Sequence, residues 1–201
     1  MPQKTPQKPQ LTMKRPDLKN LPEITLPDGY ELRTFQPGDE RAWEAIVARA
    51  FDRDVPEGHF DSRIGDHDAF QPERVFFICH NGEGVATATA WYMEKWGENT
   101  GYVHMVGVKP GHQGKRLGYQ VSLAVLHRLR GEGFEEAVLT TDDFRLPAIK
   151  TYLNLGFEPV LVHENQRERW RDVFEALGMP ELAEKYSAVL NGPVHSVGSE
   201  D

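Results

Sequence analysis

The residues best suited to chemistry form one short segment in the middle of the chain. His104–Val108 is an apolar stretch typical of a strand, and Pro110 and Gly111 end it. Gln113–Gly118 follows as a glycine-punctuated basic turn that leads into an amphipathic helix. The first turn of a helix carries unpaired N–H groups and a partial positive charge, which suit an anion such as phosphate. The segment therefore predicts a site for a phosphorylated ligand.

The spacing within this turn excludes two common nucleotide motifs. Gly114 and Gly118 allow the backbone to approach an anion closely, and Lys115 and Arg116 add positive charge. A Walker loop would need glycine where Lys109 stands and Ser or Thr where Arg116 stands. The neighbouring glycines also fail to complete the Gly-x-Gly-x-x-Gly fingerprint of dinucleotide-binding folds.

The turn resembles the acyl-CoA signature of the GNAT superfamily of acyltransferases. In that signature Val-x-Pro is followed by Arg/Gln-x-x-Gly-x-Gly/Ala, and Val108-Lys109-Pro110 and Gln113–Gly118 fill those places. One position departs from the pattern, because the first motif glycine of the family is Arg116 here. A side chain at this position keeps the backbone further from the pyrophosphate, and the positive charge of Arg116 could compensate for that loss.

A second stretch resembles another GNAT pattern, Asn-x-x-Ala-x-x-x-Tyr-x-x-Leu-Gly-Phe. Ala148, Tyr152 and Leu155-Gly156-Phe157 match it, whereas the asparagine is replaced by Arg145. The resemblance covers roughly residues 30–163. The stretch from Val103 to Pro110 is particularly similar to the second half of mycothiol synthases, a likeness that concerns the cofactor core and does not transfer their substrate. From its 201 residues we expect one such domain here and not their tandem arrangement.

The resemblance implies an acetyl-CoA-dependent N-acetyltransferase, with acetyl-CoA as co-substrate. In such enzymes the backbone of the fourth core strand binds the pantetheine arm, and the following turn receives the pyrophosphate. The residues expected to bind the cofactor are Val106, Gly107, Val108, Gln113, Gly114, Lys115, Arg116, Leu117, Gly118, Arg145 and Ala148.

Two side chains are the candidates for catalysis. Tyr152 matches the family's general acid, and the alternative is an aromatic residue on the buried face of a helix. His104 is the candidate base, since it titrates near neutrality and shares strand parity with Val106 and Val108. A structural role for this histidine remains open. Other possible bases are Tyr102, Glu94, Asp142 or a relaying water.

Periodicity predicts the elements that must position these groups. Six strands are expected near residues 30–35, 74–80, 85–93, 102–108, 137–141 and 158–163, with helices near 43–50, 117–129, 147–155, 166–177 and 180–190. The expected fold class is mixed α/β, because the order strand, helix, strand predicts a parallel crossover between the fourth and fifth of these strands. The resemblance implies a central, mostly antiparallel sheet of about six to seven strands flanked by helices and splayed between strands four and five.

Composition divides the chain into four segments. Residues 1–28 are rich in Pro, Lys and Gln and predict a flexible tail. Residues 29–163 form the predicted acetyltransferase domain, 164–190 a C-terminal helical extension and 191–201 a polar tail. The stripe around Trp170 in the extension is expected to pack on the domain or on a second subunit, so a homodimer is possible.

Charge and hydropathy restrict the partners. The formal net charge is −8, and residues 1–20 hold five Lys or Arg against one Asp, which leaves −12 for the remainder. We expect no nucleic-acid binding, and the acidic body mildly favours an amine-bearing acceptor. The single cysteine and the lack of a long apolar run predict a soluble, cytoplasmic protein with no membrane contact.

Two further features have competing interpretations. His59, Asp61, Asp66, His67 and Asp68 lie close together in the polar segment 52–71 and could ligate a metal, although their spacing matches no known site and a loop bordering the acceptor cleft is preferred. We therefore predict no metal. Cys79 lies in an apolar run and is interpreted as a small core residue, with a covalent acyl-cysteine route as the alternative.

The leading functional hypothesis is acetyl transfer from acetyl-CoA to a primary amine, by direct attack and with a small-molecule acceptor preferred. Alternatives are a protein lysine or N-terminal acetyltransferase, a catalytically silent acyl-CoA-binding module marked by Arg116 and Arg145, and an interaction protein. The acceptor itself has no recognisable pattern in the sequence.

Overall fold

The computed structural model describes residues 8–196, which divide into two compact units. The larger unit comprises residues 16–137, and the smaller unit comprises residues 8–15 together with 138–196. Strand β6 (Glu136–Thr141) begins in the larger unit and continues in the smaller one.

The larger unit is built on four consecutive antiparallel strands. Their registers pair Leu32 with Ile78, Phe76 with Ala88, and Ala90 with Val103. The strands are β2 (Tyr30–Thr34), β3 (Val75–His80), β4 (Glu83–Tyr92) and β5 (Thr100–Val108), the long helices are α1 (Glu40–Phe51) and α2 (Leu117–Gly131), and the short helices are η1 (Asp61–Gly65), η2 (Pro72–Arg74) and η3 (Glu94–Trp96).

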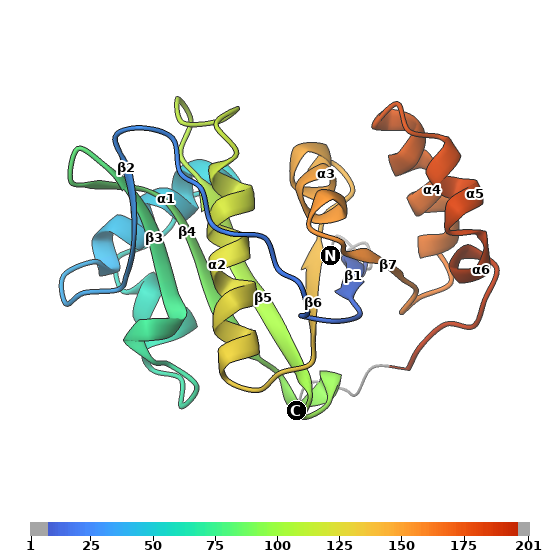
Figure 1. The fold of residues 1–201 in the computed structure, drawn as a ribbon, viewed down its shortest axis with the longest axis horizontal. Coiled ribbons are helices and arrows are strands. Elements are labelled where there is room, and N and C mark those ends of the chain that lie inside the picture. The colour runs from blue at the N-terminus through green and yellow to red at the C-terminus, as the bar shows by residue number, and fades with distance from the viewer. Residues whose placement is uncertain (1–7, 197–201) are drawn as a thin grey trace, which may run out of the picture. The chain divides into compact units, whose positions relative to one another are not determined.

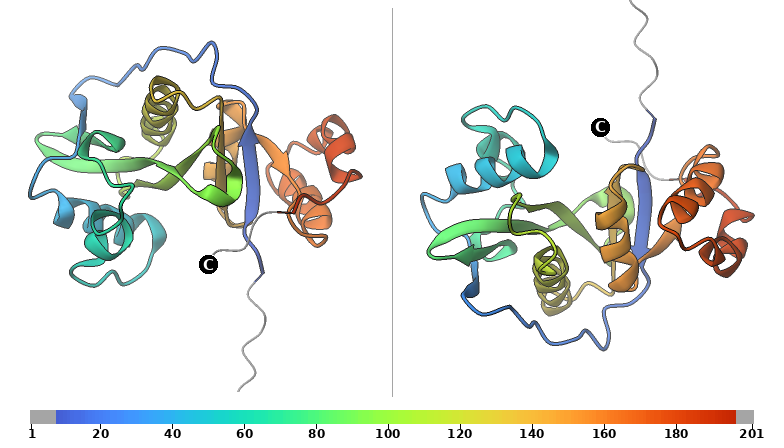
Figure 2. Two further views of the ribbon diagram at one scale, coloured as in Figure 1. Left: turned by 90° about the horizontal axis from the view of Figure 1, so that it is seen from below. Right: turned by 90° about the horizontal axis from the view of Figure 1, so that it is seen from above.

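Helices α1 and α2 cover opposite faces of these strands, as Figure 2 shows. Two glycines of β5 permit the close packing. A Cβ added to Gly107 would lie 3.1 Å from the Cβ of Ala50 in α1, and one added to Gly101 would lie 2.6 Å from Cδ1 of Leu129 in α2. Each face of the sheet therefore contacts one helix at van der Waals distance.

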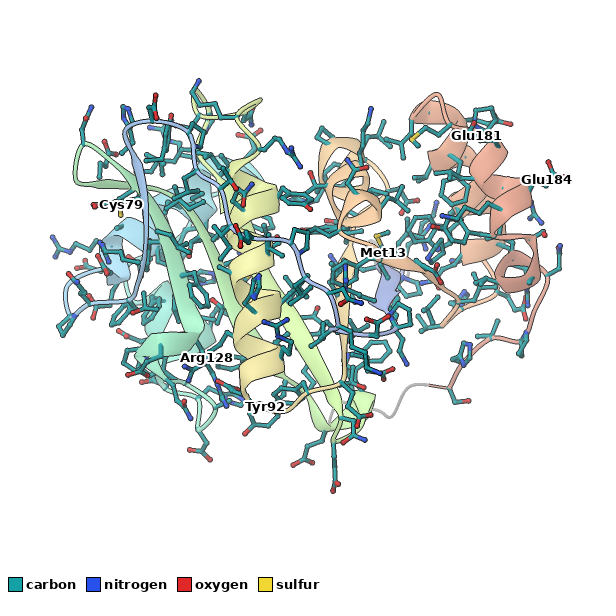
Figure 3. All side chains as sticks on the ribbon, in the orientation of Figure 1. Met13, Cys79, Tyr92, Arg128, Glu181 and Glu184 are labelled. Atoms are coloured by element: carbon teal, nitrogen blue, oxygen red, sulfur yellow. The ribbon has the colours of Figure 1, made fainter. Side chains whose placement is uncertain are left out.

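The C-terminal end of α2 is closed by a cluster of charged residues. The Arg74 guanidinium donates to both carboxylate oxygens of Glu132 at 3.0 Å, and Arg128 pairs with the same carboxylate. Figure 3 labels Arg128 and Tyr92 near this end of the helix. Arg74 also lies 5.5 Å from the ring centroid of Tyr92, so the exposed tyrosine has a cationic neighbour.

The smaller unit combines three strands with four helices. Strand β1 pairs antiparallel with β7, with Met13 opposite Pro159, and Met13 is fully buried. The elements are β1 (Leu11–Arg15), the continuation of β6, α3 (Leu146–Asn154), β7 (Glu158–Val160), α4 (Gln166–Ala176), α5 (Glu181–Lys185) and α6 (Ser187–Leu190). Trp170, Phe174 and Tyr186 stack on one another with ring centroids 5.7 and 5.9 Å apart, so the predicted aromatic stripe packs within this unit.

The interpretation of residues 1–28 as a flexible tail is wrong for residues 11–18. Residues 1–7 lie outside the described part, but 11–15 form β1, and Leu11 and Leu18 are buried. The apolar alternation of Leu11-Thr12-Met13 is too short to stand out among the surrounding Pro, Lys and Gln. Its pairing partner lies almost 150 residues away in the sequence, beyond the reach of local patterns.

The strands hydrogen-bond in the order β2-β3-β4-β5-β6-β1-β7. Antiparallel registers join β2 to β3, β3 to β4, β4 to β5 and β1 to β7. The prediction of a mixed, mostly antiparallel sheet of six to seven strands flanked by helices is confirmed, with β1 as the strand that was not expected. The splay between the fourth and fifth predicted strands stays a prediction.

Arg169 holds three segments of the smaller unit together from α4. Arg169 is only 8% exposed, and its Nε donates to the Asp143 carboxylate at 2.8 Å. It also donates to the carbonyl oxygen of Pro9 at 2.8 Å and to Oδ1 of Asn165 at 3.1 Å. This one guanidinium therefore connects the entry to β1, the segment before α3 and helix α4.

Replacing Arg169 by Met should lower the free energy of unfolding by about 3 kcal/mol, because Asp143 and the Pro9 carbonyl lose a buried donor. The exposed Arg171 of the same helix is the matched control, and Arg171→Met should change stability by less than about 0.5 kcal/mol. Urea unfolding monitored by fluorescence measures both. Equal effects of the two changes would contradict the role assigned to Arg169.

The pair of Arg169 and Asp143 also makes the stability of the fold depend on pH. The hydrogen bond from Arg169 lowers the pKa of Asp143, so the pair stabilises the fold above the carboxyl pKa of the unfolded chain, which is about 3.9. That stability is lost as the pH falls through the lower pKa of the folded state. The Arg169→Met chain should therefore lose less stability than the parent chain during acidification in this range.

Candidate active site

The predicted anion site is the loop of residues 109–116 between β5 and α2, which we call the anion loop. Gly111, Gly114 and Arg116 have φ angles of +86°, +77° and +59°. The segment from Gln113 to Arg116 is exposed. The first hydrogen bond of α2 runs from the Gln120 N–H to the Arg116 carbonyl at 3.0 Å, so the preceding N–H groups of the first turn are open to an anion.

Arg116 shows why the family has glycine at its position. It is the N-cap of α2 and adopts a left-handed conformation, which costs a side chain roughly 1 kcal/mol and glycine almost nothing. Its guanidinium lies 4.6 Å from the ring centroid of Tyr119, so the positive charge stays beside the loop. The structure also brings Gly118 and Val108 together, since a Cβ on Gly118 would lie 3.6 Å from Cγ2 of Val108.

Strand β5 contains a β-bulge that was not predicted from the sequence. Thr87 pairs with Gly107 and Thr89 pairs with His104, so two residues of β5 stand opposite one residue of β4. Met105 has φ +52°, which is unusual for a side chain other than glycine, asparagine or aspartate. Met105 and Val106 therefore have no partner in the register with β4.

The bulge corrects the predicted parity of His104. Because His104 and Gly107 pair with Thr89 and Thr87, they lie on the face of the sheet that α1 covers. Val108 lies on the other face, beside Gly118 of α2. The expectation that His104 and Val108 share a face is therefore wrong, because it assumed an uninterrupted strand.

His104 lies among aromatic rings on the α1 side. Its ring centroid is 5.6 Å from that of Tyr102 and 5.9 Å from that of Trp91, and His67 lies 4.9 Å from Trp91. Burial, together with the positive charge of Arg63 and His67, lowers the pKa of His104 to about 4. Its imidazole is therefore neutral near pH 7 and able to accept a proton.

Thr89 is a further polar residue on this face that the sequence analysis did not select. It is fully buried directly opposite His104, and its Oγ1 has no hydrogen-bond partner among the described residues. A buried hydroxyl without a partner carries a free-energy cost. Threonine is an ordinary strand residue, so only the register of β4 and β5 reveals its place beside His104.

Tyr152 belongs to helix α3 in the smaller unit. It is 7% exposed, and its ring meets that of Phe157 edge to face at 6.0 Å. The helix ends as predicted, since Gly156 has φ +80° and the Phe157 N–H donates to the Tyr152 carbonyl at 3.0 Å. Arg15 of β1 donates to the Leu155 carbonyl and so closes the same end of the helix.

Arg145 and Ala148 occupy the first turn of α3, where the Ala148 N–H donates to the Arg145 carbonyl at 2.9 Å. The Arg145 guanidinium pairs with Asp142 at 3.1 Å and lies 5.2 Å from the ring centroid of Phe144. His104 and the anion loop belong to the larger unit, and Tyr152, Arg145 and Ala148 to the smaller one. The predicted roles of these residues stay predictions.

The remaining candidates have simpler settings. Cys79 is fully buried, and burial raises the pKa of its thiol, so its interpretation as a core residue is confirmed. Glu94 is exposed in η3, and Asp142 is engaged by Arg145. Among residues 8–196, no group of three or more His, Cys, Asp or Glu side chains is placed to hold a metal ion.

Comparison with known proteins decides the family. Residues 40–157 match the acetyltransferase (GNAT) family. The chain belongs to the GNAT family. The matched region includes β5, the anion loop, α2 and α3, which carry the two motifs identified in the sequence.

The curated relatives of this GNAT chain include mycothiol acetyltransferases. The chain is 37% identical over 150 residues to that of Saccharomonospora viridis, covering 69% of this chain and 49% of the relative. It is 35% identical over 153 residues to that of Thermomonospora curvata, covering 73% and 50%. The chain therefore spans about half the length of the curated relatives it matches.

Solved structures share the fold at lower identity. A GCN5-related N-acetyltransferase from Sphaerobacter thermophilus has a TM-score of 0.58 at 23% identity, covering 76% of this GNAT chain and 49% of that chain. The ribosomal-protein-S18-alanine N-acetyltransferase from Escherichia coli has a TM-score of 0.52 at 23% identity, covering 64% and 77%. These likenesses support the fold.

Arg116→Gly should be more stable than Arg116→Ala by about 1 kcal/mol, because both remove the side chain and only glycine relieves the left-handed backbone. Lys115, whose φ is not positive, gives the matched control. At that position alanine should be as stable as glycine or better. Thermal or urea unfolding of the four variants measures the difference, and an alanine preference at both positions would contradict the observed loop conformation.

The stability of the chain should fall as the pH falls from about 6.5 towards 4. The unfolded chain binds a proton at His104 near its ordinary pKa of 6.5, whereas the folded chain does so only at about 4. The difference amounts to about 3 kcal/mol at the acid end. NMR titration of the His104 ring measures the pKa, His104→Gln should flatten the pH dependence, and a midpoint near 6.5 would contradict this prediction.

Proposed function

We propose that this chain is an acetyl-CoA-dependent N-acetyltransferase that acetylates a primary amine, with an amine on a small molecule preferred over a protein lysine or N-terminus. The observation that carries the proposal is the bulged strand β5, which leads directly into an exposed anion loop and the open N-terminus of α2. In a member of the GNAT family, this arrangement suits an acyl-CoA.

Acetyl-CoA would supply the acetyl group as an activated thioester. The N–H groups of Gln113–Gly118, together with Lys115 and Arg116, would bind the pyrophosphate. The backbone of Val106 and Val108 would bind the pantetheine arm as though it were an added strand. Backbone N–H groups at the bulge around Met105 would stabilise negative charge that develops on the carbonyl oxygen during attack by the amine.

The ammonium form of the amine must lose one proton to the solvent before the nitrogen attacks. With a pKa of about 10.4, roughly one amine in 10³ is neutral at pH 7, a cost of about 4 to 5 kcal/mol. His104 is neutral there, but its pKa of about 4 makes it a weak base towards a free ammonium ion. We assign it the proton that the amine nitrogen releases as the new bond forms, when that nitrogen is more acidic.

The departing thiolate needs a proton in turn. A phenol with a pKa of about 10 can donate to a thiolate of similar basicity, and Tyr152 is the residue that matches the family's general acid. Its position on α3 is defined by the Phe157 contact and by the glycine-ended last turn, so the ring has little freedom to rotate away.

Two observations bear on the acceptor. The name of the relatives, mycothiol acetyltransferase, supports a small-molecule acceptor. The rings of Trp91 and Tyr102, which are 4% and 6% exposed, give His104 an apolar surrounding that favours the neutral form of an amine over its ammonium form.

A second candidate function is a silent acyl-CoA-binding module. It is favoured by Arg116 and Arg145, which stand where the family has glycine and asparagine, and by the Asp142 partner that engages Arg145. Calorimetry with acetyl-CoA, followed by a free-thiol release assay over a panel of amines, separates the two. Release of CoA thiol with any amine supports the enzyme, binding without release supports the module, and the absence of binding would overturn both.

Tyr152→Phe should lower kcat by at least about 100-fold, since a positioned general acid contributes on the order of 10²–10⁴. Affinity for CoA, measured by calorimetry, should change by less than about twofold. The matched control is Tyr186→Phe, another buried tyrosine of the smaller unit, which should leave kcat unchanged. Unchanged turnover in the Tyr152 variant would remove this residue from the chemistry.

A further inference from the structure

We propose that Tyr30 and His112 are positioning residues that hold the anion loop in the conformation that binds the phosphates of acetyl-CoA. The Tyr30 hydroxyl and Nδ1 of His112 lie 2.9 Å apart, within hydrogen-bond distance. His112 directly precedes Gln113, the first residue of the exposed part of the loop. The inference rests on the proposed function, because it concerns the same cofactor site.

The anion loop has a tethered half and an open half. At its start, the Lys109 N–H donates to the Val85 carbonyl at 2.8 Å and the Lys109 Nζ pairs with Glu83 at 2.7 Å. The His112 N–H donates to the Lys109 carbonyl at 3.2 Å. Residues 113–116 are exposed instead, so the direction of their N–H groups depends on where the tethered half ends. His112 is the last tethered residue.

Tyr30 is itself held firmly at the first position of β2. It stands opposite His80 in the β2–β3 register, with ring centroids 4.6 Å apart. His80 also lies 5.5 Å from His112, so the three rings form one cluster. The Tyr30 N–H donates to the Pro27 carbonyl at 3.1 Å, and Gly29 has φ +80° in the turn between them. The hydroxyl that meets His112 is therefore fixed by the sheet.

The segment that leads to Tyr30 is also attached to α2. We call residues 18–30 the strap, and Figure 1 shows this blue segment passing across α2. The Thr25 N–H donates to Oε1 of Gln120 at 3.0 Å, near the start of the helix. His127 Nε2 donates to the Pro22 carbonyl at 2.8 Å, further along it. The strap therefore connects Tyr30 to the same helix whose N-terminus completes the anion site.

The chemistry of the contact suits positioning. A phenol and an imidazole can exchange donor and acceptor roles, so this pair can form the hydrogen bond with either tautomer of the His112 ring. The loop already includes a side chain in a left-handed conformation at Arg116, and such a loop needs external contacts to remain in one conformation. Tyr30 supplies that contact from an element outside the two motifs.

The test is calorimetry of CoA binding to the full chain. Tyr30→Phe keeps the ring against His80 and deletes only the hydroxyl, so Kd for CoA should rise about 3- to 10-fold. His112→Leu should have a similar effect. His112→Asn, whose Oδ1 can accept where Nδ1 now lies, should recover most of the affinity, and the Tyr30→Phe/His112→Leu double variant should bind no worse than either single variant.

The matched control is His127→Leu, which detaches the strap from α2 away from the anion loop and should leave Kd unchanged. In the thiol-release assay, Tyr30→Phe should raise KM for acetyl-CoA by the same factor while kcat stays within about twofold. Wild-type affinity in Tyr30→Phe, or an equal loss in His127→Leu, would overturn the inference. Failure of the unchanged chain to bind CoA would overturn the proposed function and the inference with it.

Discussion

The constraint on which the larger unit depends is the β-bulge in β5. A single extra residue, with Met105 in a left-handed conformation, reverses the sides to which the rest of the strand points. His104 therefore faces α1 and the ring cluster, while Val108 faces α2 and the anion loop begins at the next residue. One strand thus presents the half-buried imidazole of His104 on one face and Val108, beside the start of α2, on the other. In an uninterrupted strand, His104 and Val108 would point to the same face of the sheet.

The local electrostatics differ from what the net charge suggests. The chain is acidic overall, yet the charges that act on His104 are positive, from Arg63 and His67, and they add to burial in lowering its pKa. Carboxylates of the larger unit are instead engaged by arginine at structural positions such as Asp39 beside Arg33 and Glu132 beside Arg74. A formal charge summed over the chain therefore says little about the field at one strand, because short distances and low solvent exposure dominate it.

The N-terminal segments make long-range contacts in both units. In the smaller unit, β1 pairs with β7 and supplies Arg15 to the end of α3, and the Pro9 carbonyl accepts from Arg169. In the larger unit, the strap follows α2 and ends at Tyr30. Among residues 8–196, no helix is long and apolar enough to cross a membrane. The described helices α2 and α4 bury apolar residues such as Val121, Leu126 and Trp170.

The local features could be predicted from the amino-acid sequence: the glycine that ends α3, the turn between β5 and α2, the helix that follows it and, through two spaced motifs, the family. These depend on a few consecutive residues, whose backbone preferences act whatever the rest of the chain does. The features that need distant partners became visible in the folded chain. Strand β1 exists because β7 pairs with it, the faces of His104 and Val108 follow from the register with β4, and His112 meets Tyr30 across 82 positions. Such contacts are set by packing and pairing between segments, which local propensity does not encode.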